Sequence, residues 1–308
     1  MTKRILVIYY SQTGQLRSII DSIVSPLKML GVETEYLEIL PEPPFPFPWR
    51  SDEFFHAFPE SFMGIPCRIE PILPKYKNDY DLILLGYSPW YLSPSIPMHA
   101  FLQSKEAASL LCGKPVITVI GCRNMWLMAQ EKIKRYLLQH KANLCGNIAL
   151  RDKAPNLVSV VTIIRWMFKG KKERSGLFPK AGVAEVDIEK ASRFAQPIME
   201  AIEANHYSDL QQKLVEFGSV EVRPNLILFE RNGSRIFKMW ASKILRKGPF
   251  GDVRRKTLLR FFKYYLLTVL FLVTPIGNVI YAFIKLFISK KIKRNIQYFS
   301  QNSLSGMN

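Results

Sequence analysis

The chain has 308 residues, of which 48% are hydrophobic and 22% charged, and its formal net charge is +18. This composition excludes a disordered, low-complexity or collagen-like chain, and the length allows one large domain or two modest ones. The cysteines are far apart and form no CxxC pair, which argues against a zinc ribbon or a disulfide scaffold and fits a reducing compartment. They are Cys67, Cys112, Cys122 and Cys145.

The positive charge is concentrated in the last quarter of the chain. Residues 231–308 contain 16 Lys and Arg against one acid, Asp252, whereas residues 1–230 contain 27 basic and 24 acidic residues. The first part therefore has the composition of an ordinary globular domain, and the basic part needs its own explanation.

The first half of the chain alternates between strands and helices. Apolar runs predict strands buried on both faces, and 3.6-residue periodicity predicts the helices between them. The strands are expected at 3–10, 34–39, 80–87, 115–121 and 143–150, and helices at 16–27, 97–111 and 125–139. This alternation predicts an α/β fold with a doubly wound parallel sheet. Ligands bind such a sheet at the carboxyl ends of its strands, here the loops 11–15, 88–95 and 122–124.

The loop after the first strand has the composition of a phosphate site. It joins a buried strand to a helix and contains hydroxyl side chains and a glycine, so that helix N-terminal N–H groups can approach an anion. Its residues are Ser11, Gln12, Thr13, Gly14 and Gln15.

Two of these loops resemble those of a known family. Tyr-Ser-Gln-Thr-Gly-Gln (10–15) resembles the flavodoxin phosphate loop, and residues 85–102 are similar to the loop of flavodoxin-like quinone reductases that frames the isoalloxazine ring. The resemblance covers roughly residues 3–150 and implies an FMN cofactor. Besides residues 11–15, it implies cofactor contacts from Ser88, Pro89, Trp90, Tyr91, Gly121, Cys122, Arg123 and Asn124.

The phosphate loop departs from the family pattern after its glycine. Gln15 and Leu16 stand where the family has Asn-Thr, so one phosphate hydroxyl is missing. Arg17 or the remaining N–H groups could compensate, or the domain could be a flavodoxin-like fold that has lost FMN.

An unusual insertion occupies residues 41–67, between the second and third strands. It contains seven prolines and seven Phe or Trp. The prolines predict a stiff extended loop. Its apolar side chains suggest a lid over the cofactor or an apolar substrate channel, or else a satellite core beneath the sheet edge.

Two further segments follow the fifth strand. Residues 155–174 combine an apolar run too short to cross a bilayer with Trp166 and a basic cluster, which is typical of an interfacial segment or of a buried helix with a solvated end. Residues 187–204 predict an amphipathic helix that covers the sheet.

The C-terminal region predicts membrane association. Residues 264–284 are 21 consecutive uncharged residues, interrupted by Pro275 and Gly277 and flanked on both sides by basic clusters that include Lys263 and Lys285. Because basic residues stay on the cytoplasmic side, this pattern favours a shallow helical hairpin over a single span. A true span and a buried helix pair in a soluble oligomer are the alternatives, and the apolar run disfavours nucleic-acid binding.

We thus expect four regions: a flavodoxin-like domain (1–205), a basic connecting region (206–256), an apolar hairpin or membrane segment (257–296) and a tail (297–308). The expected location is the cytoplasmic face of the inner membrane, bound to its anionic surface.

The sequence contains neither an HExxH nor a G-x-S-x-G motif, and its four histidines are isolated, so no metal site is predicted. A flavin carries its own hydride chemistry, and the candidates for moving a proton are Tyr91, His99 and Arg123. Cys122 is interpreted as a loop residue beside the cofactor, because no local base would activate it.

The whole chain also resembles bacterial dialkylresorcinol condensing enzymes of aryl-lipid pathways. The resemblance rests on Pro-Phe-Pro-Phe-Pro-Trp, Phe-Pro-Glu-Ser and Ile-Pro-Cys in the insertion, together with the basic apolar tail. It implies an apolar substrate and a ketosynthase and acyl carrier protein as partners. Since a flavodoxin-like domain suits redox chemistry, the hypothesis is FMN-dependent aromatisation of a dialkyl-cyclohexanedione. A flavin-free membrane scaffold and a general quinone reductase are the alternatives.

Overall fold

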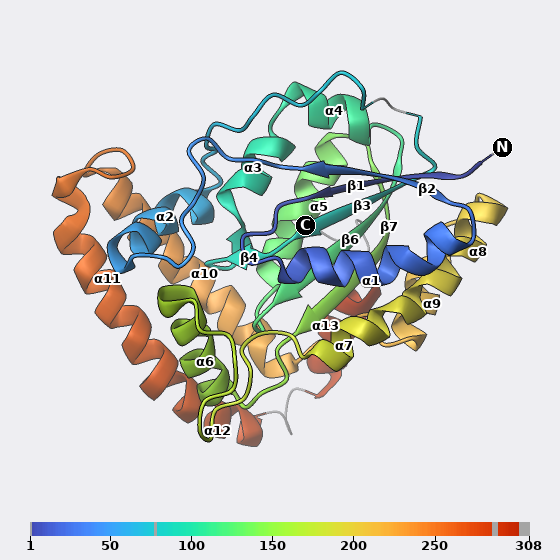
Figure 1. Ribbon diagram of the computed structural model, residues 1–308. Helices are drawn as coiled ribbons and strands as arrows, with labels where there is room; N and C mark the ends of the chain where they lie inside the picture. The colour runs from blue at the N-terminus through green and yellow to red at the C-terminus, as the bar shows by residue number, and fades with distance from the viewer. Residues whose placement is uncertain (1, 77–78, 285–288, 302–308) are drawn as a thin grey trace.

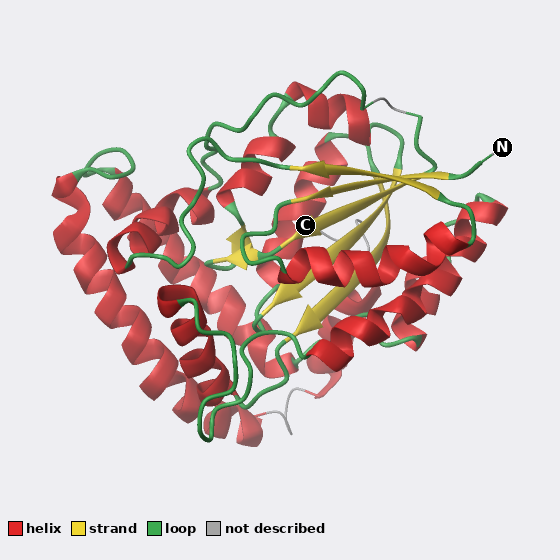
Figure 2. Cartoon of the chain, in the orientation of Figure 1, coloured by secondary structure: helices red, strands yellow, loops and turns green. Residues whose placement is uncertain are grey.

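The computed structural model describes residues 2–76, 79–284 and 289–301, and its centre is a five-stranded sheet covered by helices on both faces (Figures 1 and 2). All pairings in this sheet are parallel, in the order β2-β1-β3-β6-β7. The strands are β1 (Arg4–Tyr9), β2 (Glu33–Glu38), β3 (Leu82–Tyr87), β6 (Pro115–Cys122) and β7 (Asn143–Arg151). When only the strands of this sheet are numbered along the chain, their order is 2-1-3-4-5, which is that of the flavodoxin-like fold. The predicted fold class is therefore confirmed.

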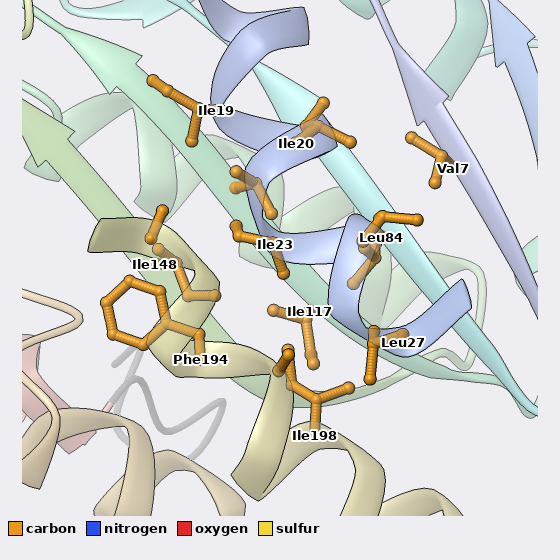
Figure 3. Close-up of a cluster of buried hydrophobic side chains, with 14 of the residues drawn as sticks. Val7, Ile19, Ile20, Ile23, Leu27, Leu84, Ile117, Ile148, Phe194 and Ile198 are labelled. Atoms are coloured by element: carbon orange, nitrogen blue, oxygen red, sulfur yellow. The ribbon is translucent and has the colours of Figure 1, made fainter. Parts of the chain in front are cut away.

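Helix α1 (Gln15–Met29) covers one face of the sheet and shows why the apolar runs form buried strands. Its residues Ile19, Ile20 and Ile23 pack on side chains that alternate strand residues send to this face, as Figure 3 shows. Fully burying each such side chain stabilises the fold by about 1.5–3 kcal/mol. The same face is completed by α7 (Glu185–Glu189), the 3-10 turn Lys190–Phe194, α8 (Ala195–Ala204) and α9 (Leu210–Glu216). The amphipathic helix expected at 187–204 is thus built from three shorter pieces.

The opposite face is covered by α3 (Ile96–Leu102), α4 (Lys105–Leu111) and α5 (Leu127–Gln139). The single helix expected at 97–111 is divided in two, because the Ser104 hydroxyl accepts the N–H of Ala107 at 3.1 Å and starts a new helix. A short antiparallel ribbon precedes α3 and consists of two strands of two residues each, β4 (Pro89–Trp90) and β5 (Ser93–Pro94).

The insertion is not the extended loop that its prolines predicted, because it contains helix α2 (Ser51–Met63). Pro59 lies inside this helix, where a proline costs about 3 kcal/mol. Three phenylalanines on α2 offset that cost, since each is almost completely buried against the C-terminal helices. They are Phe55, Phe58 and Phe62. Five of the other six prolines of the insertion lie before α2, and Pro66 follows it.

The C-terminal region is helical across Pro275. Helix α10 (Pro224–Leu245) is followed by a continuous helical stretch made of α11 (Lys256–Thr268), a π-helical turn (Val269–Val273) and α12 (Thr274–Ile284). The turn accommodates the proline, and the Thr274 hydroxyl donates to the Val269 carbonyl at 2.8 Å. The break expected at Pro275 is therefore wrong. Lys285 and the tail from 302 onward lie outside the described residues.

The α11–α12 stretch lies along α10 on the flank of the molecule, away from the sheet (Figure 1). Near its start Phe262 is buried among α10 side chains, and near its end Gly277 lies so close to Phe229 that a Cβ would be 2.7 Å from the ring. The segment Val253–Gly277 is long and apolar enough to cross a membrane, by length and composition alone. Helix α13 (Ser289–Gln301) returns to the body of the protein, where Phe299 is buried.

Candidate cofactor and substrate site

A cavity of about 250 Å³ lies at the carboxyl ends of the strands, at the point between β1 and β3 where the strand order reverses. Doubly wound sheets bind their ligands at this switch point. All three predicted loops reach it. Those lining it are Gln12, Thr13 and Gln15 of the first loop, Ser88, Pro89, Trp90 and Tyr91 of the second, and Gly121, Cys122 and Arg123 of the third.

The first loop presents unpaired backbone N–H groups at the start of α1. Gly14 adopts the left-handed conformation (φ 78°) before the helix, and no side chain caps the helix. The N–H of Arg17 reaches the Ser11 hydroxyl at 3.4 Å and that of Ser18 bonds to the Gly14 carbonyl. Within the described residues, the N–H groups of 13–16 have no partner, so this turn can receive an anion.

Arg17 does not compensate for the missing hydroxyl. Its guanidinium bonds to Asp21 at 2.8 Å and to the Tyr9 hydroxyl at 2.6 Å and lies over the Tyr36 ring, on the flank of α1. It does not line the cavity, because the side chain follows the outer side of the helix toward β2. Leu16 is buried in the core, so the anion site is left to the backbone N–H groups and the Thr13 hydroxyl.

The two glutamines of the first loop hold the walls of the cavity. Gln15 pairs with both backbone groups of Val183, at 3.2 and 3.0 Å, and this fixes the loop that contains Gly182. Gln12 donates to the Pro46 carbonyl at 2.9 Å and accepts from the Trp49 indole at 3.1 Å. The phosphate loop thus fastens the insertion over the cavity.

Each of the two interpretations of the insertion applies to a different part of it. Its extended part covers the cavity with Phe47 and Trp49, as expected for a lid, and Trp49 packs edge-on against Trp90 at 5.4 Å. Helix α2 instead forms a satellite core with α10 and α11, while Phe54 and Ala57 still line the cavity.

Tyr91 lines the cavity but is poorly suited to moving a proton. Its hydroxyl donates to the Phe54 carbonyl at 2.7 Å, and burial raises the pKa of Tyr91 well above its ordinary value. Its backbone has φ 52°, which turns the chain sharply between β4 and β5. Tyr91 therefore ties the second loop to α2.

Arg123 is the cation of the cavity. Its Nη1 donates to the Asn156 side-chain oxygen at 2.9 Å, and the described residues give it no salt bridge. Burial lowers the pKa of Arg123 to about 10, so it stays charged at neutral pH. Asn124 donates to the same Asn156 oxygen and is buried outside the cavity lining. Burial raises the pKa of Cys122, which keeps the thiol protonated.

His99 lies away from this cavity, because it is one turn into α3 and faces α5. Its ring bonds to the Ser93 hydroxyl at 2.8 Å and to the Tyr136 hydroxyl at 3.0 Å, and only 1% of the residue is exposed. Burial, with the neighbouring Lys132 charge, lowers the pKa of His99 to about 3. The structure therefore does not place it with Tyr91 and Arg123 as expected for a proton carrier.

Helix α6 (Asn156–Lys169) supplies a wall that the sequence did not reveal. Ile163, Trp166 and Met167 line the cavity from this helix, and a Cβ on Gly182 would lie 2.8 Å from the Trp166 ring. The helical period of these apolar residues was the available signal. The sequence left an interfacial segment and a buried helix with a solvated end as alternatives, and the burial of Trp166 favours the second.

No protein-family model and no curated protein matches this chain. Among solved structures it is similar to a flavoprotein in complex with FMN from Lactobacillus acidophilus NCFM, with 19% identity, 48% of this chain and 93% of that chain covered, and a TM-score of 0.38. It is similar to flavodoxin 2 from Bacillus cereus, with 18% identity and a TM-score of 0.34, and the match covers 64% of this chain and 99% of that chain. It is also similar to a flavodoxin, WrbA-like protein from Agrobacterium tumefaciens, with 8% identity and a TM-score of 0.38, and the match covers 66% of this chain and 99% of that chain. The strand order defines the fold, and none of these comparisons supports the resemblance to dialkylresorcinol condensing enzymes.

Proposed function

We propose that this protein is a membrane-associated, FMN-dependent oxidoreductase that acts on an apolar substrate. The observation that carries the proposal is the cavity at the β1/β3 switch point, where unpaired N–H groups, an aromatic wall and a buried cation meet. These three features suit FMN, through its phosphate, its ring and the negative charge that the ring gains on reduction.

The residues of the cavity fit such a cofactor. The backbone of the first loop and the Thr13 hydroxyl would hold the phosphate, and Trp90 would contact the ring. The bound cofactor would accept a hydride from the substrate. The Arg123 guanidinium would stabilise negative charge on the reduced ring or on a substrate oxygen. Phe47 and Trp49 would exclude water from the reacting groups.

The cavity lining also restricts the substrate. None of the described residues that line it is Asp, Glu, His or Lys, and the Tyr91 and Cys122 groups stay protonated. A substrate that needed a strong base would not react here. A substrate with an acidic C–H or O–H group could lose its proton to water instead.

A dialkyl-cyclohexane-1,3-dione has such a proton, which makes it our specific substrate proposal. Its aromatisation to a resorcinol would remove two hydrogens, one as a hydride that bound FMN would accept and one as a proton to water, and a quinone would be the final electron acceptor. The alkyl chains would lie along the insertion and α6. A ketosynthase with its acyl carrier protein would supply the dione.

The location that we propose is the cytoplasmic face of the inner membrane. The exposed side of α11–α12 carries large apolar side chains that solvent would not normally meet. They are Phe261, Tyr264, Leu272, Ile276 and Val279. Arg254, Lys256 and Arg260 lie near its start and suit an anionic surface. Because the opposite side of the helix packs on α10, the geometry favours a helix lying in the interface over one that crosses the bilayer.

The deciding experiment is to purify the protein in mild detergent, record its absorbance spectrum and identify any released chromophore. We expect stoichiometric FMN. Incubation of the loaded protein with a dialkyl-cyclohexanedione and a quinone should then yield the resorcinol by mass spectrometry. A colourless protein that also takes up no added FMN would contradict the proposal and favour the flavin-free scaffold, which the buried Leu16 would explain. FMN without resorcinol formation, but with quinone reduction, would favour a general quinone reductase.

A further inference from the structure

A second pocket, of about 520 Å³, lies between the end of α2, helix α5 and helix α10. It shares no lining residue with the cavity at the switch point. The pocket is strongly basic. Lys132 and Arg135 reach it from α5, and Arg235 and Lys238 reach it from α10. In each pair the residues are three apart, so they share one side of their helix.

The part of the chain that the structure describes gives these four cations no acidic partner. Among the described residues, none of the four forms a salt bridge, and no Asp or Glu lines the pocket. Placing like charges on facing helices is unfavourable, and the penalty grows as water is removed from between them. An arrangement of this kind is stabilised when an anion occupies the space between the charges.

Lys132 is held in place, unlike an ordinary surface lysine. Its Nζ donates to the Ser93 hydroxyl at 3.1 Å and to the Phe62 carbonyl, and it lies 4.2 Å from the centre of the Phe62 ring. Burial lowers the pKa of Lys132 to about 7. The ammonium is therefore partly desolvated and has no carboxylate to replace the lost water.

The buried His99 network explains why Lys132 stands where it does. The Ser93 hydroxyl donates to the Ser61 carbonyl at 2.6 Å, so its oxygen is left to accept from His99 and from Lys132. The other ring nitrogen of His99 then accepts the Tyr136 hydroxyl proton. The Ser93 and Tyr136 hydroxyl protons and the His99 ring proton are committed, and the Ser93 side chain is fully buried, so the network offers no nucleophile. It positions Lys132, whose two bonds leave the third N–H of its ammonium for a ligand.

We propose that this basic pocket binds the phosphate group of a small phosphorylated molecule or of a phospholipid headgroup. Guanidinium forks from Arg135 and Arg235 match phosphate oxygens, and Lys132 and Lys238 add point charges. The pocket exceeds the size of one phosphate ion, and its apolar wall would contact an organic remainder. That wall consists of Phe62, Met63 and Met128.

The position of the pocket leaves both sources of phosphate open. On α10 the pocket residues Arg235 and Lys238 are next in sequence to Ile236 and Met239, whose side chains are 37% and 48% exposed. The pocket residues of α10 thus alternate along the helix with exposed apolar side chains, which suit a lipid, while a soluble phosphate could enter the same pocket.

Two probes separate these sources. Inorganic pyrophosphate represents the soluble ligand, and dihexanoyl phosphatidylglycerol below its micelle concentration represents the lipid. Both are titrated into the full-length protein in uncharged detergent by calorimetry. We compare Lys238→Gln with Lys243→Gln, which removes the same charge from an exposed site of α10 outside the pocket. Circular dichroism verifies that both variants are folded.

A specific site predicts at least a tenfold loss of affinity for one of the probes in Lys238→Gln and less than a twofold change in Lys243→Gln. The probe that binds identifies the source. Equal losses in both variants would mean that only the overall charge attracts anions, and the proposal would be wrong. It would also be wrong if neither probe bound at millimolar concentration. FMN content should stay unchanged in both variants, so failure here is distinguishable from failure of the proposed function.

The phosphodiester probe also allows a pH test, because its own charge is constant between pH 6 and 8. If Lys132 must be protonated to bind, a pKa of about 7 predicts an affinity about tenfold lower at pH 8 than at pH 6. Lys132→Met should abolish this dependence, and its persistence in that variant would exclude Lys132 as the titrating group. The other titratable or charged groups facing Lys132 in the pocket are His99, Arg135, Tyr136, Arg235 and Lys238.

Discussion

A buried ion pair joins the insertion to the C-terminal helices, and its removal tests whether the two parts form one unit. Arg255, just before α11, is fully buried. Its Nη2 lies 2.8 Å from the Glu60 carboxylate of α2, and its Nε donates to the Gly248 carbonyl at 2.7 Å. The substitution Arg255→Met keeps most of the apolar stem and removes the charge.

The expected loss follows from what the substitution leaves behind. Glu60 is 7% exposed, so its carboxylate would remain buried without a cation. Breaking a buried pair in this way costs about 3–5 kcal/mol, and the lost bond to Gly248 adds about 1 kcal/mol. Since domains are stable by roughly 5–15 kcal/mol, Arg255→Met should lose a large part of the total.

The assay is urea unfolding followed by circular dichroism in one detergent. The double variant Arg255→Met/Glu60→Gln should recover much of the loss, because it no longer buries an unpaired charge. Arg254→Met is the matched control: its partner Asp252 is at 2.6 Å, but Arg254 is exposed, so little change is expected. A wild-type midpoint for Arg255→Met, or a double variant no more stable than the single one, would refute this reasoning.

Three further predictions concern the cavity, the membrane surface and the start of α5. Gly14→Ala should weaken FMN binding in a fluorescence titration. Gly31→Ala is the control, because Gly31 has a similar φ (86°, against 78° for Gly14) but is remote from the cavity, so its substitution should strain the chain without weakening FMN binding. Equal FMN affinities of the two variants would count against the anion site. Leu272→Glu with Ile276→Glu should release the protein from anionic vesicles in a flotation assay, and unchanged flotation would exclude this side of the α11–α12 stretch as the contact. Glu230 accepts the Met128 N–H at 2.8 Å, and burial raises its pKa to about 8, so the folded state keeps a proton that the unfolded chain releases above pH 4.5. The contribution of Glu230 to the free energy of unfolding should therefore fall as pH rises from about 5 to 8, against the opposite contributions of His99 and Lys132, whose pKa values are lowered. Glu230→Gln should remove this contribution, so that stability rises more with pH in thermal unfolding; a slope equal to that of the wild type would exclude Glu230 as a contributor.

The sheet and its three ligand loops could be predicted because their signals are local. A strand buried on both faces is apolar throughout, as in β3. The loop that follows such a strand lies at the carboxyl edge of the sheet, where ligands bind, independently of how the rest of the chain is arranged. For this reason the residues of three separate loops meet at one cavity.

The errors have a common cause, which is packing between distant segments. The prolines of the insertion predicted an extended chain, but Phe58 of α2 stacks on Phe262 at 3.8 Å, more than 200 residues away in the sequence. His99 followed the ring-framing loop in sequence, yet its partner Tyr136 belongs to α5. Pro275 predicted a break, but contact with α10 and a π-helical turn keep the helix continuous. None of these partners is visible in a local pattern.

Helix α2 is where the three functional regions meet. Its first turns line the cavity through Phe54 and Ala57, its last residue, Met63, lines the basic pocket, and Phe58 stacks on Phe262 of α11, the helix that we place at the membrane. Close-packed interiors transmit displacement, because side chains cannot be compressed. A membrane that shifts α11 must therefore either open the Phe58 stack or move α2 and both sites with it. In the second case, affinity for the membrane and affinity for ligands at either site are thermodynamically linked, and each changes the other by the same factor.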